Sequence, residues 1–323
     1  MKLKTVVFLI AAAALLAMAP AVQAQSYPTK AIKIIVPQPP GGNVGDIQSR
    51  LISPILSKRL GQPVVVENRA GAGGMIGTAV VAKAPPDGYT LASAQAGTVV
   101  MLPHTSKQVT YDPLKDFAAI AMTTVNYMNI YAHPQQPFKT LPEMIAYAKA
   151  NPGKLTVATN GEGAFPHLTF ELLRIMAGFT YHHVPYKGSS QAEIGVLNGE
   201  CQVGVAGASV TPQIKAGKLT LLASTGETRA PSWPDKPCAA ETVPGYSFGG
   251  WFGFIAPAGT PREIITRLNQ EINRVMNSPD VAKMMADQEM YVVNESPKYF
   301  EDAIKSDFVK YGKLVRDIGF EPR

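Results

Sequence analysis

The sequence predicts an α/β protein of two domains, each a mixed or parallel sheet flanked by helices, with a cleft between the domains. Three observations carry this prediction. The 323 residues suffice for two domains of ordinary size. Strand and helix patterns alternate along the chain, which is typical of parallel sheets covered by helices. A strand that ends in a glycine turn and leads into a helix occurs once in each half, near residue 41 and near residue 161.

The first of these units begins with a short apolar run, Ile32–Val36, which a cluster of prolines ends. This pattern predicts a buried strand, since proline cannot donate to the ladder. Gly41 and Gly42 follow, and then a helix. Its expected apolar stripe comprises Ile47, Leu51, Ile55 and Leu56. A helix start at the carboxyl edge of a sheet presents free amide N–H groups, so we predict that this turn binds a carboxylate.

The rest of the first half continues the same alternation. Strands are expected at residues 63–67 and 89–94, with a helix at residues 75–83 between them. The third strand leads into a small polar loop at residues 95–98. This loop is expected at the same sheet edge as the glycine pair.

The second half starts from a connecting strand at residues 126–132. Thr140 and Glu143 form a capping box that opens a helix to residue 150. A strand at residues 155–158 then leads into a glycine turn at residues 159–164 and another helix. Two such turns facing each other across a cleft would hold a small anion from both sides.

The remaining elements complete the two domains. Strands are expected at residues 182–185, 202–206, 219–223 and 251–256, and a helix at residues 190–197. A second capping box is predicted at residues 260–263, and Pro279 and Pro297 mark two later helix starts. We predict domain I at residues 25–125 with 252–323, and domain II at residues 126–251.

The first 24 residues have the pattern of a signal peptide. Lys2 and Lys4 precede an apolar run at residues 6–18, and a small-residue site predicts cleavage after Ala24. Cleavage removes two lysines and no acid, so the formal charge of +6 falls to +4. The positive charges are dispersed, which argues against nucleic-acid binding. We expect an exported, periplasmic, monomeric protein.

Cys201 and Cys238 are the two cysteines of the chain. In an oxidising compartment they permit one disulfide, and two separate buried thiols are the alternative. The spacing does not decide between the two.

In chain order, several segments resemble the Bug-type (TctC-like) periplasmic receptors of tripartite tricarboxylate transporters. They are YPTKAIKIIVPQPPGG, LGQPVVVENRAGAGGMIG, DGYTL, TLPEMIAYAKANPGKL, HVPYKG and GWFGFIAPAGTP. The resemblance covers essentially the whole mature chain. It implies a type II-like periplasmic binding protein fold, a small organic carboxylate as ligand, and membrane transporter subunits as partners.

The resemblance also implies the site residues. One ligand carboxylate would lie between the two glycine turns, partly through ordered water. The candidates are Gln38, Gly41, Gly42, Asn43, Val44 and Asp46 in the first turn, Gln95, Gly97 and Thr98 in the cleft wall, and Thr159, Asn160, Gly161, Gly163, Ala164 and His167 in the second turn.

This chain departs from the family pattern at several positions. The family usually has Phe where Gln38 stands, and two residues rather than three between the glycine pair and Asp46. The family often has acids around Gly195 and Ala206, which this chain lacks. A ligand amino group would need such an acid, so a carboxylate without an amino group, aromatic or hydroxylated, is favoured.

Other function classes have weaker support. The glycines of residues 71–77 do not match the dinucleotide fingerprint, and the five histidines show no metal-binding spacing, so we predict no cofactor and no metal. His182 and His183 would point to opposite faces of a strand. We found no nucleophile elbow, zinc-protease motif or P-loop, and we predict a protein that is not an enzyme. A carboxylate sensor is the alternative to a transport receptor, and a hydrolase with an unrecognised triad is the third class.

Overall fold

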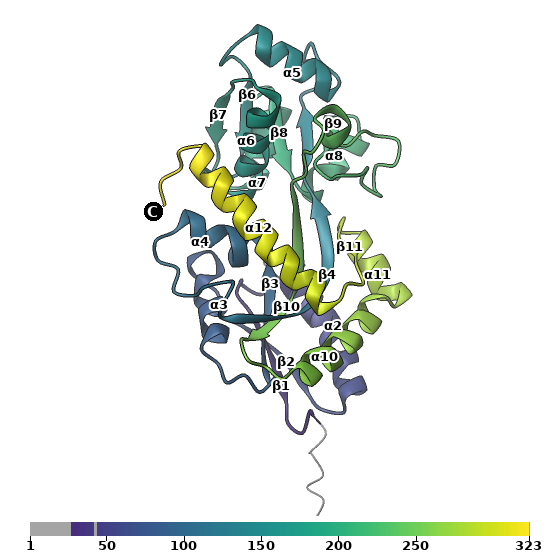
Figure 1. Ribbon diagram of the computed structural model, residues 1–323. Coiled ribbons are helices and arrows are strands. Elements are labelled where there is room, and N and C mark those ends of the chain that lie inside the picture. The colour runs from purple at the N-terminus through teal and green to yellow at the C-terminus, as the bar shows by residue number, and fades with distance from the viewer. Residues whose placement is uncertain (1–26, 42–43, 323) are drawn as a thin grey trace, which may run out of the picture.

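The computed structural model describes residues 27–41 and 44–322 of the chain. Within them lie two mixed sheets flanked by helices, one below and one above in Figure 1. The six-stranded first sheet has the order β11-β4-β10-β3-β1-β2, and the five-stranded second sheet has the order β7-β6-β8-β5-β9. The predicted α/β class with two sheets is confirmed.

The first sheet comprises β1 (Ile32–Val36), β2 (Val64–Asn68), β3 (Thr90–Gln95), β4 (Phe117–Tyr127), β10 (Gly249–Pro257) and β11 (Tyr291–Val292). The helices beside these strands in the chain are α2 (Val44–Leu60), η1 (Ala72–Gly74), α3 (Met75–Ala82), η2 (Gly97–Met101), α4 (Leu102–Thr105), α10 (Arg262–Met276), α11 (Pro279–Ala286) and α12 (Pro297–Asp317).

The second sheet comprises β5 (Asn129–Ala132), β6 (Thr156–Thr159), β7 (His182–Pro185), β8 (Val203–Ala206) and β9 (Thr220–Ser224). Its helices are α5 (Leu141–Ala150), α6 (Phe165–Ala177), α7 (Ser189–Leu197), η3 (Ala208–Val210), α8 (Thr211–Lys215) and α9 (Ala239–Thr242).

Each sheet has a parallel core that brings strand ends together. β1 pairs in parallel with β2 and β3, and β6 pairs in parallel with β7 and β8. The carboxyl ends of the strands in each group therefore lie at one sheet edge. That edge is where open α/β folds bind ligands.

The chain passes between the two sheets at two places, after β4 and before β10. The prediction of a single strand at residues 126–132 is wrong, because β4 ends at Tyr127 and β5 begins at Asn129, with Met128 between them. The N–H of Met128 donates to Thr225 Oγ1 at 2.8 Å and so leaves the sheet ladder. The return strand predicted at residues 251–256 is confirmed as β10.

The predicted apolar stripe of α2 is also wrong in part. Ile47 and Ile55 are 39% and 38% exposed, whereas Ser49 and Ser53 are buried. The Ser49 hydroxyl donates to the Gly45 carbonyl at 2.6 Å, and the Ser53 hydroxyl donates to the Ser49 carbonyl. These bonds to the preceding turn satisfy small polar side chains, so they can be buried.

The two predicted capping boxes have different outcomes. The box of Thr140 and Glu143 at the start of α5 is confirmed. The box predicted at residues 260–263 is wrong, because Thr260 donates its hydroxyl to the Pro257 carbonyl at 2.8 Å and Pro261 occupies the capping position of α10.

Helix α12 connects the two halves of the molecule. It crosses in front of β4 and β10 in Figure 1, from the first sheet towards the second. Along its length it packs on β4 and η2 and then on α6. Its start at Pro297 was predicted, and so was that of α11 at Pro279.

Candidate functional site

Asp46 is the centre of the first glycine turn. Gly41 has a left-handed backbone with φ 66°, and its N–H donates to Asp46 Oδ2 at 2.7 Å. Arg50 Nε donates to the same oxygen at 2.9 Å, and Asn68 Nδ2 donates to Oδ1 at 2.7 Å. Asp46 is only 1% exposed, so its carboxylate ties the end of the turn to the start of α2. Of the other predicted residues here, Val44 begins α2, whereas Gly42 and Asn43 lie outside the described residues.

The Asp46 carboxyl is held in its ionised form. Burial by itself would raise its pKa, but the hydrogen bonds from Arg50, Gly41 and Asn68 outweigh burial, and the pKa is lowered. The negative charge of Asp46 is thus bound by hydrogen-bond donors of the protein itself.

Asn68 and Arg50 belong to this turn, and the sequence analysis missed both. Asn68 Nδ2 also donates to the Gln38 carbonyl at 2.9 Å, and Arg50 donates to Asn68 Oδ1 at 2.6 Å. A signal for Asn68 was present, because it is a polar residue at the carboxyl end of a strand that pairs in parallel with β1.

Gln38, Gln95 and Thr98 converge on Gly74. A Cβ atom placed on Gly74 would lie 2.9 Å from Thr98 Oγ1 and 3.1 Å from Gln38 Nε2. Gln95 Nε2 donates to Thr98 Oγ1 at 2.9 Å. Gln38 Nε2 is buried without a hydrogen-bond partner among the described residues. The end of β1, the start of α3 and the end of β3 therefore meet here.

The prediction of a loop at residues 95–98 is wrong. Gln95 is the last residue of β3, and Gly97 and Thr98 begin the π-helical turn η2. Tyr111 fixes this turn by donating its hydroxyl to the Thr98 carbonyl at 2.5 Å. These residues therefore lie at the carboxyl end of β3, which pairs in parallel with β1.

The second glycine turn connects β6 to α6. Thr159 is the last residue of β6, and Ala164 is the residue before the helix. Gly161 and Gly163 have φ 141° and φ 70°, which are backbone conformations that residues other than glycine rarely adopt. Asn160 has a buried Oδ1 without a hydrogen-bond partner among the described residues.

His167 lies directly beneath this turn. The Gly163 N–H donates to His167 Nδ1 at 3.0 Å, and His167 is 8% exposed. Its ring stacks on the ring of His183 from β7, with 4.0 Å between centroids and 11° between planes. His183 Nε2 shares a hydrogen bond of 2.6 Å with Thr159 Oγ1. His182 is exposed beside it, as expected from strand alternation.

Both stacked imidazoles favour their neutral forms. Burial lowers the pKa of His167, while Glu171 and Glu162 act in the opposite direction. Burial and the neighbouring His167 lower the pKa of His183 to about 4. The sequence analysis treated His183 only as a strand residue, and its contact with His167 is tertiary.

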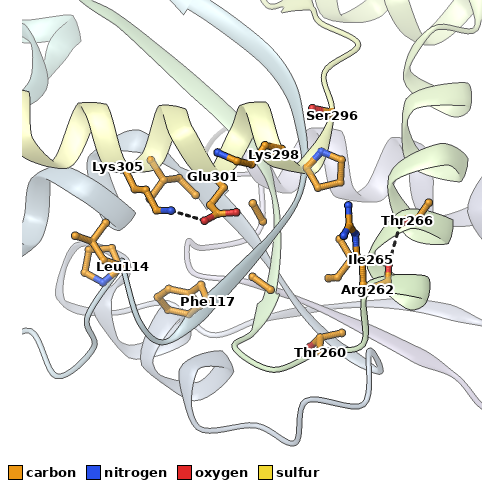
Figure 2. Close-up of a pocket in the computed structure, with 15 residues that line it drawn as sticks. Leu114, Phe117, Thr260, Arg262, Ile265, Thr266, Ser296, Lys298, Glu301 and Lys305 are labelled. Atoms are coloured by element: carbon orange, nitrogen blue, oxygen red, sulfur yellow. Dashed lines mark hydrogen bonds and ion pairs between the residues drawn. The ribbon is translucent and has the colours of Figure 1, made fainter.

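The predicted site residues thus form two groups, one at each sheet edge, and the hydrogen bonds described above stay within each group. Two cavities of the described residues lie away from both groups, and a third borders the second turn through Glu162. Figure 2 shows one of 740 Å³ between α10, α12 and the start of β4, lined by Arg262, Phe117 and the ion pair of Lys305 with Glu301. Another, of 830 Å³, lies beside β10 and α12, and one of 470 Å³ includes Lys107 and Glu162.

Cys201 and Cys238 are free thiols, and both are buried. Cys201 Sγ lies 3.7 Å from the Tyr186 hydroxyl, and Cys238 Sγ lies 3.5 Å from the Glu227 carbonyl oxygen. Of the two alternatives that the spacing left open, the structure has the separate thiols.

Residues 27–41 and 44–322 contain neither a metal-binding cluster nor a membrane-spanning helix. No group of three or more His, Cys, Asp or Glu side chains there is placed to hold a metal ion. No helix in that part of the chain is long and apolar enough to cross a membrane.

The chain is similar to known proteins both in sequence and in fold. The profile of the tripartite tricarboxylate transporter family receptor (TctC) matches residues 49–320. The protein BugT of Bordetella pertussis is 35% identical over 302 residues, which are 92% of this chain and 92% of BugT.

Solved structures extend the match to three dimensions. A TctC solute-binding protein from Polaromonas without ligand is 27% identical, with a TM-score of 0.82, over 90% of this chain and 100% of that one. Rpa4515 of R. palustris with adipate is 29% identical, with a TM-score of 0.75, over 92% and 100%. MatC of Rhodopseudomonas palustris with malate is also 29% identical, with a TM-score of 0.71, over 90% and 100%. The chain therefore belongs to the tripartite tricarboxylate transporter receptors, a family of periplasmic solute-binding proteins and not of enzymes.

Proposed function

We propose that this receptor captures a small organic carboxylate between its two glycine turns and delivers it to a tripartite membrane transporter. One observation carries the proposal: each sheet has a parallel core whose carboxyl edge bears a glycine turn and a helix start. Relatives of the same fold hold adipate and malate. Backbone N–H groups at a helix start favour an anion.

The proposed binding residues are those of the two turns and the wall between them. The first group comprises Gln38, Gly41, Gly42, Asn43, Val44, Asp46, Gln95, Gly97 and Thr98. The second group comprises Thr159, Asn160, Gly161, Gly163, Ala164 and His167. Asp46 and His167 act from behind the turns, because both are buried and hydrogen-bonded to turn amides. The unpartnered amide atoms of Gln38 and Asn160 supply additional polar groups, one in each turn.

Binding is proposed to close the two domains about the passages after β4 and before β10. Closure would exclude water and strengthen the amide contacts to the anion.

The proposed site of action is the periplasm. The first 24 residues, which lie outside the described residues, are proposed to be a signal peptide cleaved after Ala24. The mature receptor would then be available to membrane subunits.

A thermal-shift screen of the protein from Gln25 onward tests the function. The panel contains dicarboxylates, tricarboxylates, aromatic acids, amino acids and neutral sugars. A ligand at about a hundred times its Kd adds about 2.7 kcal/mol of stability. Stabilisation by one carboxylate class, lost when the acid is amidated, is the expected result. Stabilisation by neutral compounds alone would contradict carboxylate capture.

A pair of glycine variants locates the site. Gly161→Asp places a charge in the second turn and is expected to abolish ligand stabilisation. Gly153→Asp is the matched control, because Gly153 also has positive φ, at 73°, but follows α5 at the opposite edge of the second sheet. Equal ligand shifts in the two variants would place the ligand away from the second turn.

A further inference from the structure

The second glycine turn is supported from below by a chain of side chains on α6 and β7. The backbone N–H of Gly163 can only donate, so His167 Nδ1 accepts this hydrogen bond and carries no proton. The neutral ring then has its proton on Nε2, which lies 3.9 Å from Glu171 Oε1. Arg174 holds Glu171 in place, with 2.7 Å between Nη2 and Oε2.

His183 fixes the orientation of that ring. It stacks on His167 at 4.0 Å and bonds through Nε2 to Thr159 at the end of β6. Thr159 and Gly163 are the two ends of the glycine turn that His167 and His183 contact. The imidazole pair therefore links both ends of the turn to the scaffold.

We propose that His167, supported by His183, is the positioning residue that keeps the second glycine turn in its binding form, and that a proton on His167 Nδ1 releases the turn. The proposal rests on the proposed function and adds a regulation to the same site. Carboxylate capture then weakens in acid, once His167 takes up this proton.

The physical reason is a conflict of donors. A proton on Nδ1 would place two N–H groups against each other across the 3.0 Å that now separates donor from acceptor. It would also put a charged ring 4.0 Å from the second imidazole. Both changes force Gly163 or His167 to move.

The charged groups around the pair come from three elements. Glu171 and Arg174 lie on α6, Glu162 lies on the turn, and His182 lies beside His183 on β7. The two carboxylates favour a proton on the imidazoles and Arg174 opposes it, yet burial keeps the pKa of His167 below its ordinary value. The neutral form is therefore the resting form at neutral pH.

Two variants of His167 distinguish the effect of losing the hydrogen-bond acceptor from the effect of gaining a charge. His167→Asn keeps an acceptor near the position of Nδ1 and does not titrate. His167→Leu fills similar space and removes the acceptor. His133→Asn is the matched control, because His133 Nδ1 also accepts a backbone N–H, from Gln135 at 3.3 Å, but lies just past β5 at the opposite edge of the second sheet.

The first measurement is hydrogen exchange at the Gly163 amide of the ligand-free protein, which needs no ligand. At pH 7.5 we expect wild type and His167→Asn to protect this amide and His167→Leu to lose protection about tenfold, the size of one hydrogen bond. After correction for intrinsic exchange, wild type is expected to lose protection at pH 5, and His167→Asn is not. Equal protection in all three proteins at both pH values would overturn the proposal.

The second measurement is calorimetric titration with malate or adipate, whichever gives the larger thermal shift. His167→Leu is expected to bind about tenfold more weakly at pH 7.5, and His167→Asn to recover most of that loss. At pH 5 the affinity of wild type should approach that of His167→Leu. The affinity of His167→Asn should be nearly the same at pH 5 as at pH 7.5. His133→Asn should match wild type at both pH values. An acid loss in His167→Asn as large as in wild type would assign the pH effect to another group.

The two measurements separate failure of the function from failure of the inference. Absence of binding by every carboxylate would reject carboxylate capture, and the amide exchange would still test the support of the turn. Binding that is unaffected in His167→Leu would reject the positioning role alone. Should His167→Leu not fold, the comparison of wild type with His167→Asn across pH decides the matter.

Discussion

Trp251 donates its indole N–H to the carboxylate of Asp307, with 2.8 Å between Nε1 and Oδ2. This bond ties β10, the strand that returns from the second sheet, to helix α12, which lies across both halves of the molecule. Trp251 is 4% exposed. A movement between the two halves of the molecule must therefore either keep this bond between β10 and α12 or break it.

The charge on Asp307 is expected to destabilise the folded protein at neutral pH. Burial raises the pKa of Asp307, although the bond from Trp251 and the charge of Lys310 act in the opposite direction. A carboxyl whose pKa is raised on folding favours the fold most below its unfolded pKa, and this contribution is lost as the pH rises through the folded pKa. Asp307→Asn keeps an acceptor for Trp251 and removes the charge. We expect this variant to be more stable than wild type at pH 7, with the difference vanishing near pH 3 in urea denaturation.

Asp307→Leu is the companion variant. It removes the acceptor and leaves the indole N–H buried without a partner, which costs about 1–3 kcal/mol. An Asp307→Asn protein that is less stable than wild type at pH 7 would show that the ionised carboxylate is a net gain beside Lys310.

Asp46 is expected to have the opposite dependence on pH. Its pKa is lowered in the folded state, so its contribution is present above the unfolded pKa and is lost as the pH falls through the folded pKa. Asp46→Asn would set an amide against the donors Gly41 and Arg50, and we expect a loss of about 2 kcal/mol at pH 7. The loss relative to wild type should shrink at pH 3 in urea denaturation.

The control for Asp46 is an exposed acid at another helix start. Asp280 lies in the first turn of α11, and Asp280→Asn should change stability by only about 0.3–1 kcal/mol. Similar losses in the two variants would mean that Asp46 acts through the helix dipole and not through the hydrogen bonds from Gly41, Arg50 and Asn68.

Local patterns predicted the units of this fold, and tertiary contacts account for what they missed. The apolar run before Gly41 and the capping box of Thr140 are local signals, and both predicted their elements correctly. The stripe of α2 was misjudged, because serines that bond to the preceding turn can be buried in place of isoleucines.

The candidate site was predictable to the same extent. Glycine turns can be found in a sequence, so the turn at residues 159–164 was expected where the structure has it. Of the first turn, Gly41 and the helix that begins at Val44 lie where they were expected, and Gly42 lies outside the described residues. The stack of His183 on His167 depends on β7 packing beside α6, and no spacing in the chain encodes that contact. Whether the remaining turn residues contact a ligand stays a prediction.

Gly163 and Phe320 form a second testable contact at the site. Gly163 has φ 70°, and a Cβ atom there would lie 2.7 Å from the Phe320 ring beyond the end of α12. Gly163→Ala should therefore lose about 1–2 kcal/mol to backbone strain and a further part to the clash. Adding Phe320→Ala should restore the stability that is lost to the clash, but not the stability that is lost to backbone strain.

A double-mutant cycle in urea separates the two parts. The expected result is a favourable coupling between Gly163→Ala and Phe320→Ala, with the strain of Gly163→Ala remaining. Strict additivity of the two single losses would show that the ring moves aside freely and that the tail after α12 does not rest on the turn.

The stacked histidines should make the free protein less stable in mild acid. His183 has its pKa lowered to about 4 by burial and by His167, whereas the unfolded chain takes up a proton at its ordinary pKa of about 6.5. The unfolded state therefore binds more protons between these values, and stability is complete above pH 6.5 and falls as the pH drops towards 4. His183→Phe keeps a ring for the stack and removes this titration, although it loses the bond to Thr159. Wild type should be the more stable protein at pH 7.5, and the two urea midpoints should converge at pH 4.5. Midpoints that run parallel across this range would show that His183 does not control the acid response of the fold.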